Sequence, residues 1–238
     1  LALHIAITYA NQRRQFDSGI GTDEVVLLDY GKHQRRLLPR LAQVYAQFIV
    51  DSPRRNAMLV QMAQACAKPA LLFVNHIAHG KELVKMLRAA GLKSGFTYGT
   101  DPVEIRRDRI KRLVRGDLDV LVCNVVFQEG IDIPSLASVI IGAGGKSVIA
   151  ALQRIGRGMR TAAGKGEFEV WDVLDRGQRW MKAHALGRFN AYGREGHQVT
   201  VIEPGALALL AATGPADPQG VVGAGAPPPQ PSGLVAAV

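Results

Sequence analysis

Short apolar runs alternate with amphipathic stretches through the middle of the chain. Runs such as DVLVCNVV at 119–126 are almost wholly apolar, which is typical of strands buried on both faces of a parallel sheet. Between them, apolar residues recur three and four positions apart, which is the spacing of an amphipathic helix. The pattern predicts strands at 70–74, 94–98, 120–125, 137–141 and 168–174, with helices at 79–90, 102–115 and 147–159 between them.

Strands that alternate with helices predict an α/β fold, a doubly wound parallel sheet with helices on both faces. Two further helices are expected before the sheet, one from His33 and one from Pro53 to Ala67. A last helix, at 178–192, is expected to bury Trp180, Ala183, Leu186 and Phe189, with Arg188 among the basic residues around that side.

The ends of the chain differ from its middle. Residues 11–32 are polar and interrupted by glycines, and only a short strand at 25–28 is expected there. Beyond Pro204 the composition becomes rich in Ala, Gly and Pro, which indicates a disordered tail. We therefore expect an N-terminal segment at 1–50, the α/β domain at 51–200 and a disordered tail at 201–238.

Charge and composition narrow the class of partner. The formal net charge of +9 favours anionic partners, and nucleic acid is favoured over a membrane surface because no basic amphipathic helix has an aromatic face. No apolar run reaches the ~18 residues of a membrane span, and the N-terminus lacks the pattern of a signal peptide. Cys66 and Cys123 lie in core-like runs, which indicates buried thiols of a reducing compartment. We expect an intracellular, cytoplasmic protein.

Polar residues follow three of the predicted strands directly. In a doubly wound sheet, ligands gather beyond the carboxyl ends of the strands, so these residues are candidates for a binding site. They are Asn75 and His76, Gly99 and Thr100, and Asn124.

The helix predicted at 147–159 carries a second candidate site. Arg157 and Arg160 lie three residues apart beside Gly156 and Gly158, an arrangement that suits a polyphosphate as well as it suits a solvated arginine face. The preceding GAGGKS at 142–147 has the position of a phosphate-binding loop, between a strand and a helix. The motif is incomplete, because Ile140 stands where its first glycine belongs.

Three weaker signals have ordinary structural explanations. In QEGIDIPSL at 128–136, Gly130 lets the backbone approach a ligand and Asp132 offers a carboxylate, but a simple turn explains both. The basic stretch EIRRDRIKRLVRG at 104–116 is explained better by a solvated helix face than by a nucleic-acid stripe. His76 and His79 have no supporting Cys or His, so no metal site is expected.

Taken together, four segments resemble known motifs in order and spacing. FVNHIAHGKEL, YGT, VLVCNVVFQEGIDIPSLASVI and LQRIGRGMR resemble motifs IV, IVa, V and VI of superfamily 2 DNA helicases and translocases, in particular the phage and bacterial DExH-type enzymes. In those enzymes a GKS turn precedes motif VI and a D-x-x-D strand end follows it, here Asp172 and Asp175. The resemblance covers about residues 50–195 and implies the C-terminal RecA-like lobe of an ATP-driven motor.

The resemblance also implies roles for single residues. Arg157 and Arg160 would be arginine fingers that reach the γ-phosphate of ATP, and Gln153 would help to orient them. Gly130 and Asp132 would contact the nucleotide. Asn75, His76, Gly99, Thr100 and Asn124 would lie along the phosphate backbone of one nucleic-acid strand, and Asn124 replaces the usual threonine.

The first lobe of such a motor is not evident in these 238 residues. There is no complete Walker A motif and no DExH-like acidic motif, so ATP and Mg²⁺ would be bound mainly by an N-terminal lobe in the same longer chain. We expect this chain alone to be inactive as an ATPase. The alternatives are a non-catalytic nucleic-acid- or protein-binding module, and a stand-alone P-loop enzyme built on GAGGKS.

Overall fold

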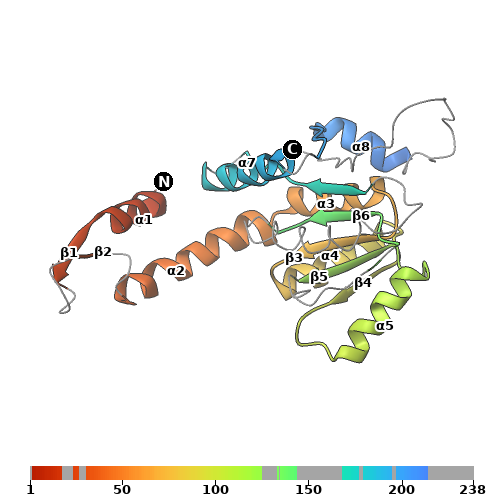
Figure 1. Cartoon of the computed structure of the whole chain (residues 1–238), viewed down its shortest axis with the longest axis horizontal. Helices are drawn as coiled ribbons and strands as arrows, with labels where there is room; N and C mark the ends of the chain where they lie inside the picture. Colours follow the sequence, from red (N-terminus) through yellow and green to blue (C-terminus); the bar gives the residue numbers. More distant parts are fainter. Residues whose placement is uncertain are drawn as a thin grey trace. The chain divides into compact units, whose positions relative to one another are not determined.

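The computed structural model of the chain describes residues 2–17, 24–26, 31–124, 133, 135–143, 168–176, 179–194 and 197–213. The chain divides into two compact units, Leu1–Ser52 and Pro53–Val238 (Figure 1). The helix expected at 147–159 lies outside the described residues.

The first unit is built from helices and one hairpin. Helix α1 spans Ala2–Gln12, strands β1 (Arg14–Asp17) and β2 (Glu24–Val26) pair antiparallel, and helix α2 spans Gly31–Tyr45. A π-helical turn, η2, continues α2 over Ala46–Val50. Among the described side chains of this unit, only Ala10 and Ile49 are buried, so the unit has little core of its own.

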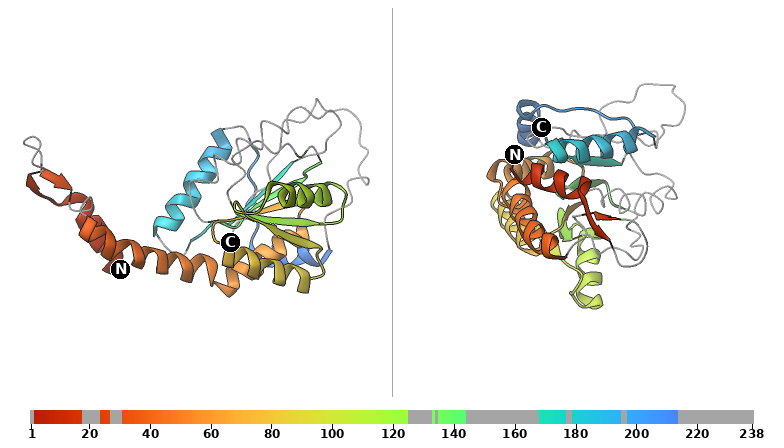
Figure 2. Two further views of the ribbon diagram at one scale, coloured as in Figure 1. Left: turned by 90° about the horizontal axis from the view of Figure 1, so that it is seen from below. Right: turned by 90° about the vertical axis from the view of Figure 1, so that its left-hand side faces the viewer.

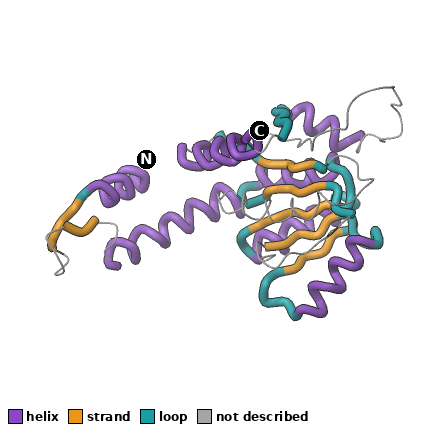
Figure 3. Tube along the Cα trace, in the orientation of Figure 1, coloured by secondary structure: helices purple, strands orange, loops and turns teal. Residues whose placement is uncertain are grey.

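The second unit contains a five-stranded parallel sheet, as the apolar runs predict. Its strands are β3 (Ala70–Val74), β4 (Ser94–Thr97), β5 (Val120–Asn124), β6 (Ser138–Ile141) and β7 (Glu169–Asp172). They lie in the order β4-β5-β3-β6-β7, and every neighbouring pair is parallel. Figure 3 shows the strands of this sheet side by side. All carboxyl ends therefore meet at one edge of the sheet.

Helices cover both faces of this sheet. Helices α3 (Pro53–Ala65), α4 (Ile77–Ala89) and α8 (Pro204–Thr213) contribute to one hydrophobic cluster, and α5 (Val103–Val114) and α7 (Arg179–Arg194) contribute to the other. The left view of Figure 2 shows the two groups on opposite sides of the strands. The doubly wound α/β fold expected from the sequence is confirmed.

Alternate residues of each strand point to opposite faces, which explains how one apolar run serves two cores. In β3, Leu72 and Val74 belong to the cluster with α3 and α4, while Leu71 and Phe73 belong to the cluster with α5 and α7. The two cysteines are free and buried, as expected. Burial raises the pKa of both the Cys66 and the Cys123 thiol.

The buried side of α7 differs from the expected one. Leu186 is 45% exposed and Ala183 is also exposed, so the predicted apolar side was wrong at these two positions. Phe189 is half-buried and packs against the second cluster, as predicted. The helix instead buries Met181, Ala185, Arg188 and Tyr192. Arg188 was expected among the exposed basic residues, but it can be buried because Asp172 pairs with it.

The first part of the segment predicted as a disordered tail is helical. We expected disorder from residue 201, but α8 extends over Pro204–Thr213 and packs against α3, with Leu207 fully buried. The reason is that Ala and Leu are strong helix formers, and Pro204 occupies the first helical position, where proline is tolerated. Within the described residues, no helix has the length and apolar character needed to cross a membrane.

Candidate nucleic-acid interface

The polar residues predicted as a site follow three neighbouring strands. The order β4-β5-β3 brings Gly99 and Thr100, Asn124, and Asn75 and His76 to adjacent carboxyl ends. Asn124 is the last residue of β5, and the other four follow their strands. Asn75, His76 and Thr100 are exposed, while Gly99 and Asn124 are half-buried. The fold thus brings together five candidates that lie up to 50 positions apart in the chain, and it presents three of them to solvent.

One hydrogen bond joins two of these loops directly. The backbone N–H of Gly99 donates to Oδ1 of Asn124 over 3.2 Å. This bond fixes the acceptor side of the Asn124 amide, whose NH₂ group can only donate. A donor held at the carboxyl edge of the sheet suits an anionic ligand such as phosphate.

Asp101 holds the loop that carries Gly99 and Thr100. Its carboxylate accepts hydrogen bonds from Thr97 Oγ1 (3.1 Å) and from the Tyr98 backbone N–H (2.9 Å), and it also pairs with Arg109 of α5. Asp101 is buried, so these three donors compensate for the loss of its hydration. The role of Asp101 was not predicted from the sequence. The signal that the sequence offers is an acidic residue directly before Pro102, at the start of a predicted helix.

His79 has a structural environment and not a ligand-binding one. The ring is buried in α4, and Nε2 lies 2.8 Å from Oδ1 of Asn56, which can only accept, so Nε2 carries the proton. Burial, together with the positive charges of Arg55 and His76, lowers the pKa of His79 to about 4. The imidazole is therefore neutral at pH 7.

The end of β7 carries a cluster of buried charges. Arg188 donates from Nε to Asp172 Oδ2 (2.7 Å) and from a terminal nitrogen to Asp172 Oδ1 (2.9 Å), and the Tyr192 hydroxyl donates to Asp172 Oδ2 (3.0 Å). Burial and the neighbouring Asp172 carboxylate hold the pKa of the Tyr192 phenol well above its ordinary value. Burial acts to lower the pKa of Arg188, but the Asp172 carboxylate outweighs it and the net shift is upward.

Asp175 belongs to a second pair, which reaches back to the start of α3. Its carboxylate binds Arg55, and Arg55 also donates to the Gly142 carbonyl over 3.3 Å. Burial raises the pKa of Asp175, although Arg55 opposes this shift. Gly142 itself passes close to β3, since a Cβ atom there would lie 2.8 Å from the Phe73 carbonyl oxygen. Asp172 and Asp175 thus both serve buried ion pairs of the fold.

The other predicted site residues lie outside the described residues. These are the proposed nucleotide contacts and arginine fingers, Gly130, Asp132, Gln153, Arg157 and Arg160, together with most of GAGGKS.

Comparison with known proteins assigns the class of this α/β unit. Residues 54–162 match the helicase conserved C-terminal domain. Together with the five-stranded parallel sheet, this match identifies the unit as the C-terminal RecA-like lobe of a superfamily 2 helicase.

Two curated relatives belong to the same class. The ATP-dependent DNA helicase uvsW of enterobacteria phage T4 is 27% identical over 144 residues, which are 59% of this chain and 29% of that protein. The ATP-dependent RNA helicase SrmB of Escherichia coli is 35% identical over 111 residues, which are 46% of this chain and 25% of that protein. The crystal structure of T4 UvsW superposes with a TM-score of 0.51 at 25% identity, covering 64% of this chain and 35% of that one. The aligned part of this chain thus corresponds to between a quarter and about a third of these helicases.

The N-terminal part of the chain has a different likeness. Residues 1–104 match the C-alpha1 domain of acyl-CoA oxidase, a range that overlaps the helicase match from residue 54 onward. Acyl-coenzyme A oxidase 3 of Arabidopsis thaliana, a peroxisomal protein, is 54% identical over 46 residues, which are 19% of this chain and 7% of that protein.

Proposed function

We propose that residues 51–200 act as the C-terminal motor lobe of an ATP-dependent superfamily 2 DNA helicase or translocase. The observation that carries the proposal is the set of polar residues beyond β4, β5 and β3, within a segment that matches a helicase domain. Parallel strands bring these residues to one edge, where a single nucleic-acid strand can pass all of them.

In this proposal the exposed strand ends bind phosphates of the nucleic-acid backbone. Asn75, His76 and Thr100 donate hydrogen bonds to phosphate oxygens, and Asn124 donates from its NH₂ group. The Gly99 N–H already donates to Asn124, so we assign the phosphate contact of that loop to Thr100. Contacts of this kind are independent of base sequence and weaken with salt. DNA is proposed over RNA because the motif pattern resembles DNA helicases, although SrmB is named an RNA helicase.

ATP would bind between this lobe and an N-terminal lobe that supplies the Walker A lysine and the Mg²⁺ ligand. Arg157 and Arg160 would contact the γ-phosphate, with Gln153 orienting them. Gly130 and Asp132 would contact the nucleotide and couple it to the nucleic-acid edge. Hydrolysis supplies the free energy for movement, and the arginines stabilise the charge that develops on the transferred phosphoryl group.

Two structural roles are considered for residues 1–50. The sequence alone suggests a connection between helicase lobes, whereas the likeness to acyl-CoA oxidases favours a separate helical module joined to the helicase lobe. We favour the separate module because residues 1–52 form their own compact unit and the match to the acyl-CoA oxidase domain begins at residue 1.

Nucleic-acid binding by the chain as it stands tests the proposed interface. We would measure fluorescence anisotropy with a labelled single-stranded DNA, the matching RNA and a duplex, for the wild type and for Asn75→Ala/Thr100→Ala. Each hydrogen bond to a charged group contributes about 1.5–3 kcal/mol, so the double variant should bind DNA at least about tenfold more weakly. Asn190→Ala/Thr200→Ala removes the same side-chain types at exposed positions elsewhere and should bind as the wild type does. Equal binding by both double variants would contradict the interface.

The motor role needs a different experiment. In a two-lobe protein that carries this lobe, Arg160→Ala should lower DNA-stimulated ATP turnover by a factor of about 10³ or more while ATP affinity changes little. The control is Arg179→Ala, an exposed arginine of α7. Nucleic-acid binding with unchanged turnover in Arg160→Ala would favour the non-catalytic binding module.

A further inference from the structure

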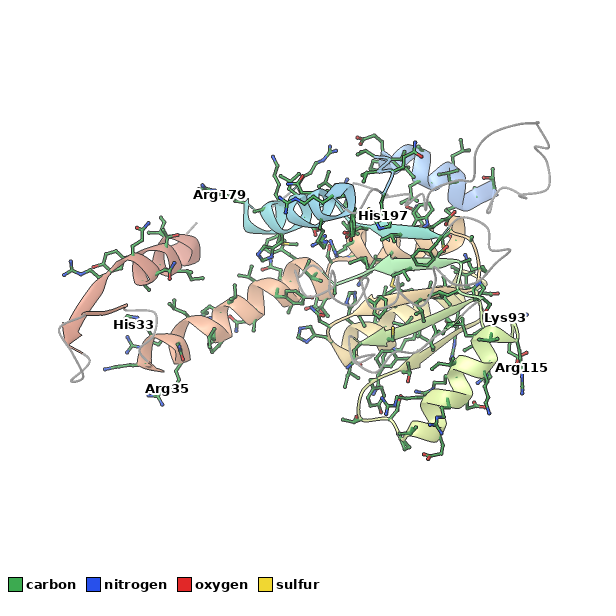
Figure 4. All side chains as sticks on the ribbon, viewed as in Figure 1. His33, Arg35, Lys93, Arg115, Arg179 and His197 are labelled. Atoms are coloured by element: carbon green, nitrogen blue, oxygen red, sulfur yellow. The ribbon has the colours of Figure 1, made fainter. Side chains whose placement is uncertain are left out.

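Helix α5 carries a row of basic side chains on its solvent side. Arg107, Lys111 and Arg115 recur every four residues, so they lie on the same face of the helix, and all three are exposed. Figure 4 labels Arg115 directly after the end of this helix. At 1.5 Å per residue, the row is about 12 Å long. Each strand of a duplex carries one phosphate per ~3.4 Å of helix axis. The row is therefore long enough to face about three or four successive phosphates.

These cations are not engaged within the fold. In the part of the chain that the structure describes, none of the ion pairs involves Arg107, Lys111, Arg112 or Arg115. Three exposed acids, Glu104, Asp108 and Asp117, lie in the helix and the turn that follows it, so they number one fewer than the four exposed cations and a positive excess remains. The charges at the two ends of α5 also suit the helix dipole, with Glu104 in the first turn and Lys111 and Arg112 in the last. The dipole effect falls off within one turn, so it does not account for Arg107.

The helix also exposes apolar side chains. Ile105 and Val114 are 42% and 48% exposed, so apolar side chains lie among the cations. Nucleic acid offers both a charged backbone and apolar sugar and base surfaces, and such a mixed surface suits it better than a small inorganic anion.

Position in the fold connects this row to the proposed interface. Helix α5 begins three residues after Thr100, and the ion pair between Arg109 and Asp101 fixes the helix to the loop of Gly99 and Thr100. Because α5 follows β4 and runs back along the sheet, Arg107 lies nearest to the proposed phosphate-binding edge and Arg115 farthest from it.

We propose that Arg107, Lys111 and Arg115 form a second nucleic-acid contact, which binds the phosphate backbone where it leaves the strand-end interface. The proposal rests on the proposed function and extends it: the strand ends hold one strand, and α5 binds the continuation of that strand or the adjoining duplex. The solvated helix face favoured from sequence alone is the alternative that the experiment must exclude.

The test is the salt dependence of nucleic-acid binding by the full chain. Anisotropy titrations with a 30-nucleotide single strand and a 30-base-pair duplex would be run between about 50 and 300 mM KCl for the variant Arg107→Gln/Lys111→Gln/Arg115→Gln. The association constant K falls as salt rises, and each phosphate contact contributes about 0.7–0.9 to the steepness of log K against log salt. The line for the triple variant should therefore be shallower by about two units. Its affinity at low salt should fall at least tenfold.

Two further variants separate electrostatics from folding. Lys85→Gln/Lys182→Gln/Arg194→Gln removes the same charge from exposed positions on α4 and α7, and its slope should change by less than one unit. Arg107→Lys/Arg115→Lys keeps the charge and should retain binding. Equal slopes for the two charge-removing triples would overturn the α5 contact, as would failure of the wild type to bind either probe.

The outcome also separates this contact from the proposed function. Weaker binding in Asn75→Ala/Thr100→Ala alone would retain the strand-end interface and remove the α5 contact. Weaker binding in the α5 triple alone would retain the α5 contact and contradict the strand-end interface.

Discussion

Asp172 lies at the centre of the buried charge cluster formed with Arg188 and Tyr192. It accepts two hydrogen bonds from Arg188 and one from Tyr192, and both Asp172 and Arg188 are completely buried. A buried pair of this kind contributes little net stability compared with apolar residues, but removal of one partner leaves the other charge buried and uncompensated. The largest effect of the pair on stability is therefore expected in variants that lack one of its partners.

We expect Arg188→Met to lower the free energy of unfolding by about 3–5 kcal/mol, because Asp172 then lacks its counter-charge. Tyr192→Phe removes one hydrogen bond and should cost about 1–2 kcal/mol. Urea unfolding followed by circular dichroism measures both values. Arg179→Met, at an exposed position of the same helix, serves as the control and should stay within about 0.5 kcal/mol of the wild type.

His79 makes the stability depend on pH. Its pKa is about 4 in the fold and near 6.5 when exposed, so the folded state favours the neutral ring. The associated stability is fully present above about pH 6.5 and is lost as the pH falls toward 4. The difference corresponds to roughly 3 kcal/mol. In urea unfolding between pH 7 and 4, the wild type should lose about that much more stability than His79→Gln, and parallel curves for the two proteins would show that burial of the ring is not responsible.

At the scale of elements, α8 shows how a segment of simple composition becomes part of a core. Leu207 is fully buried in the cluster that also contains Leu59 and Met62 of α3, while Leu209 on the same helix is 68% exposed. The helix therefore has one face packed against α3 and another facing solvent.

This asymmetry predicts different results for two chemically identical substitutions. Leu207→Ala should destabilise the lobe by about 2–5 kcal/mol through lost burial and a cavity. Leu209→Ala should change stability by less than about 0.5 kcal/mol. Thermal and urea unfolding of the two variants side by side would decide the matter. A similar small effect for both would mean that α8 contributes nothing to the core.

At the scale of the whole molecule, the two units differ in how they are stabilised. The described part of the second unit has two hydrophobic clusters, whose buried residues run from Met58 to Leu207. The first unit, among its described side chains, buries only Ala10 and Ile49. A segment of about 50 residues with so small a core is marginal by itself.

Removal of residues 1–52 should therefore leave the helicase lobe folded. We expect the free energy of unfolding of residues 53–238 to lie within about 1 kcal/mol of that of the full chain. The shortened chain should bind single-stranded DNA with the same affinity. Denaturant unfolding and anisotropy would test this. A large loss of stability or of binding would instead support the connection between lobes that the sequence first suggested for residues 1–50.

How much could be predicted varies with the kind of feature. The five strands were located within two residues at each end, because each is an apolar run too short for a helix and separated by amphipathic stretches. Alternation within a run also predicts which residues share a face. The buried side of α7 was predicted wrongly, because its burial depends on the charge pair between Arg188 and Asp172, which are 16 positions apart.

The sequence by itself determined the parallel α/β class, the polar residues at the strand ends and the resemblance to helicase motifs, because these depend on local periodicity and on motif order along the chain. Only the tertiary structure decided the strand order, the bond from Gly99 to Asn124, the Asp101 anchor and the burial of Arg188 and Leu207. Each of these depends on contacts between distant segments. Their energies come from desolvation and pairing in a shared interior, which no local pattern specifies.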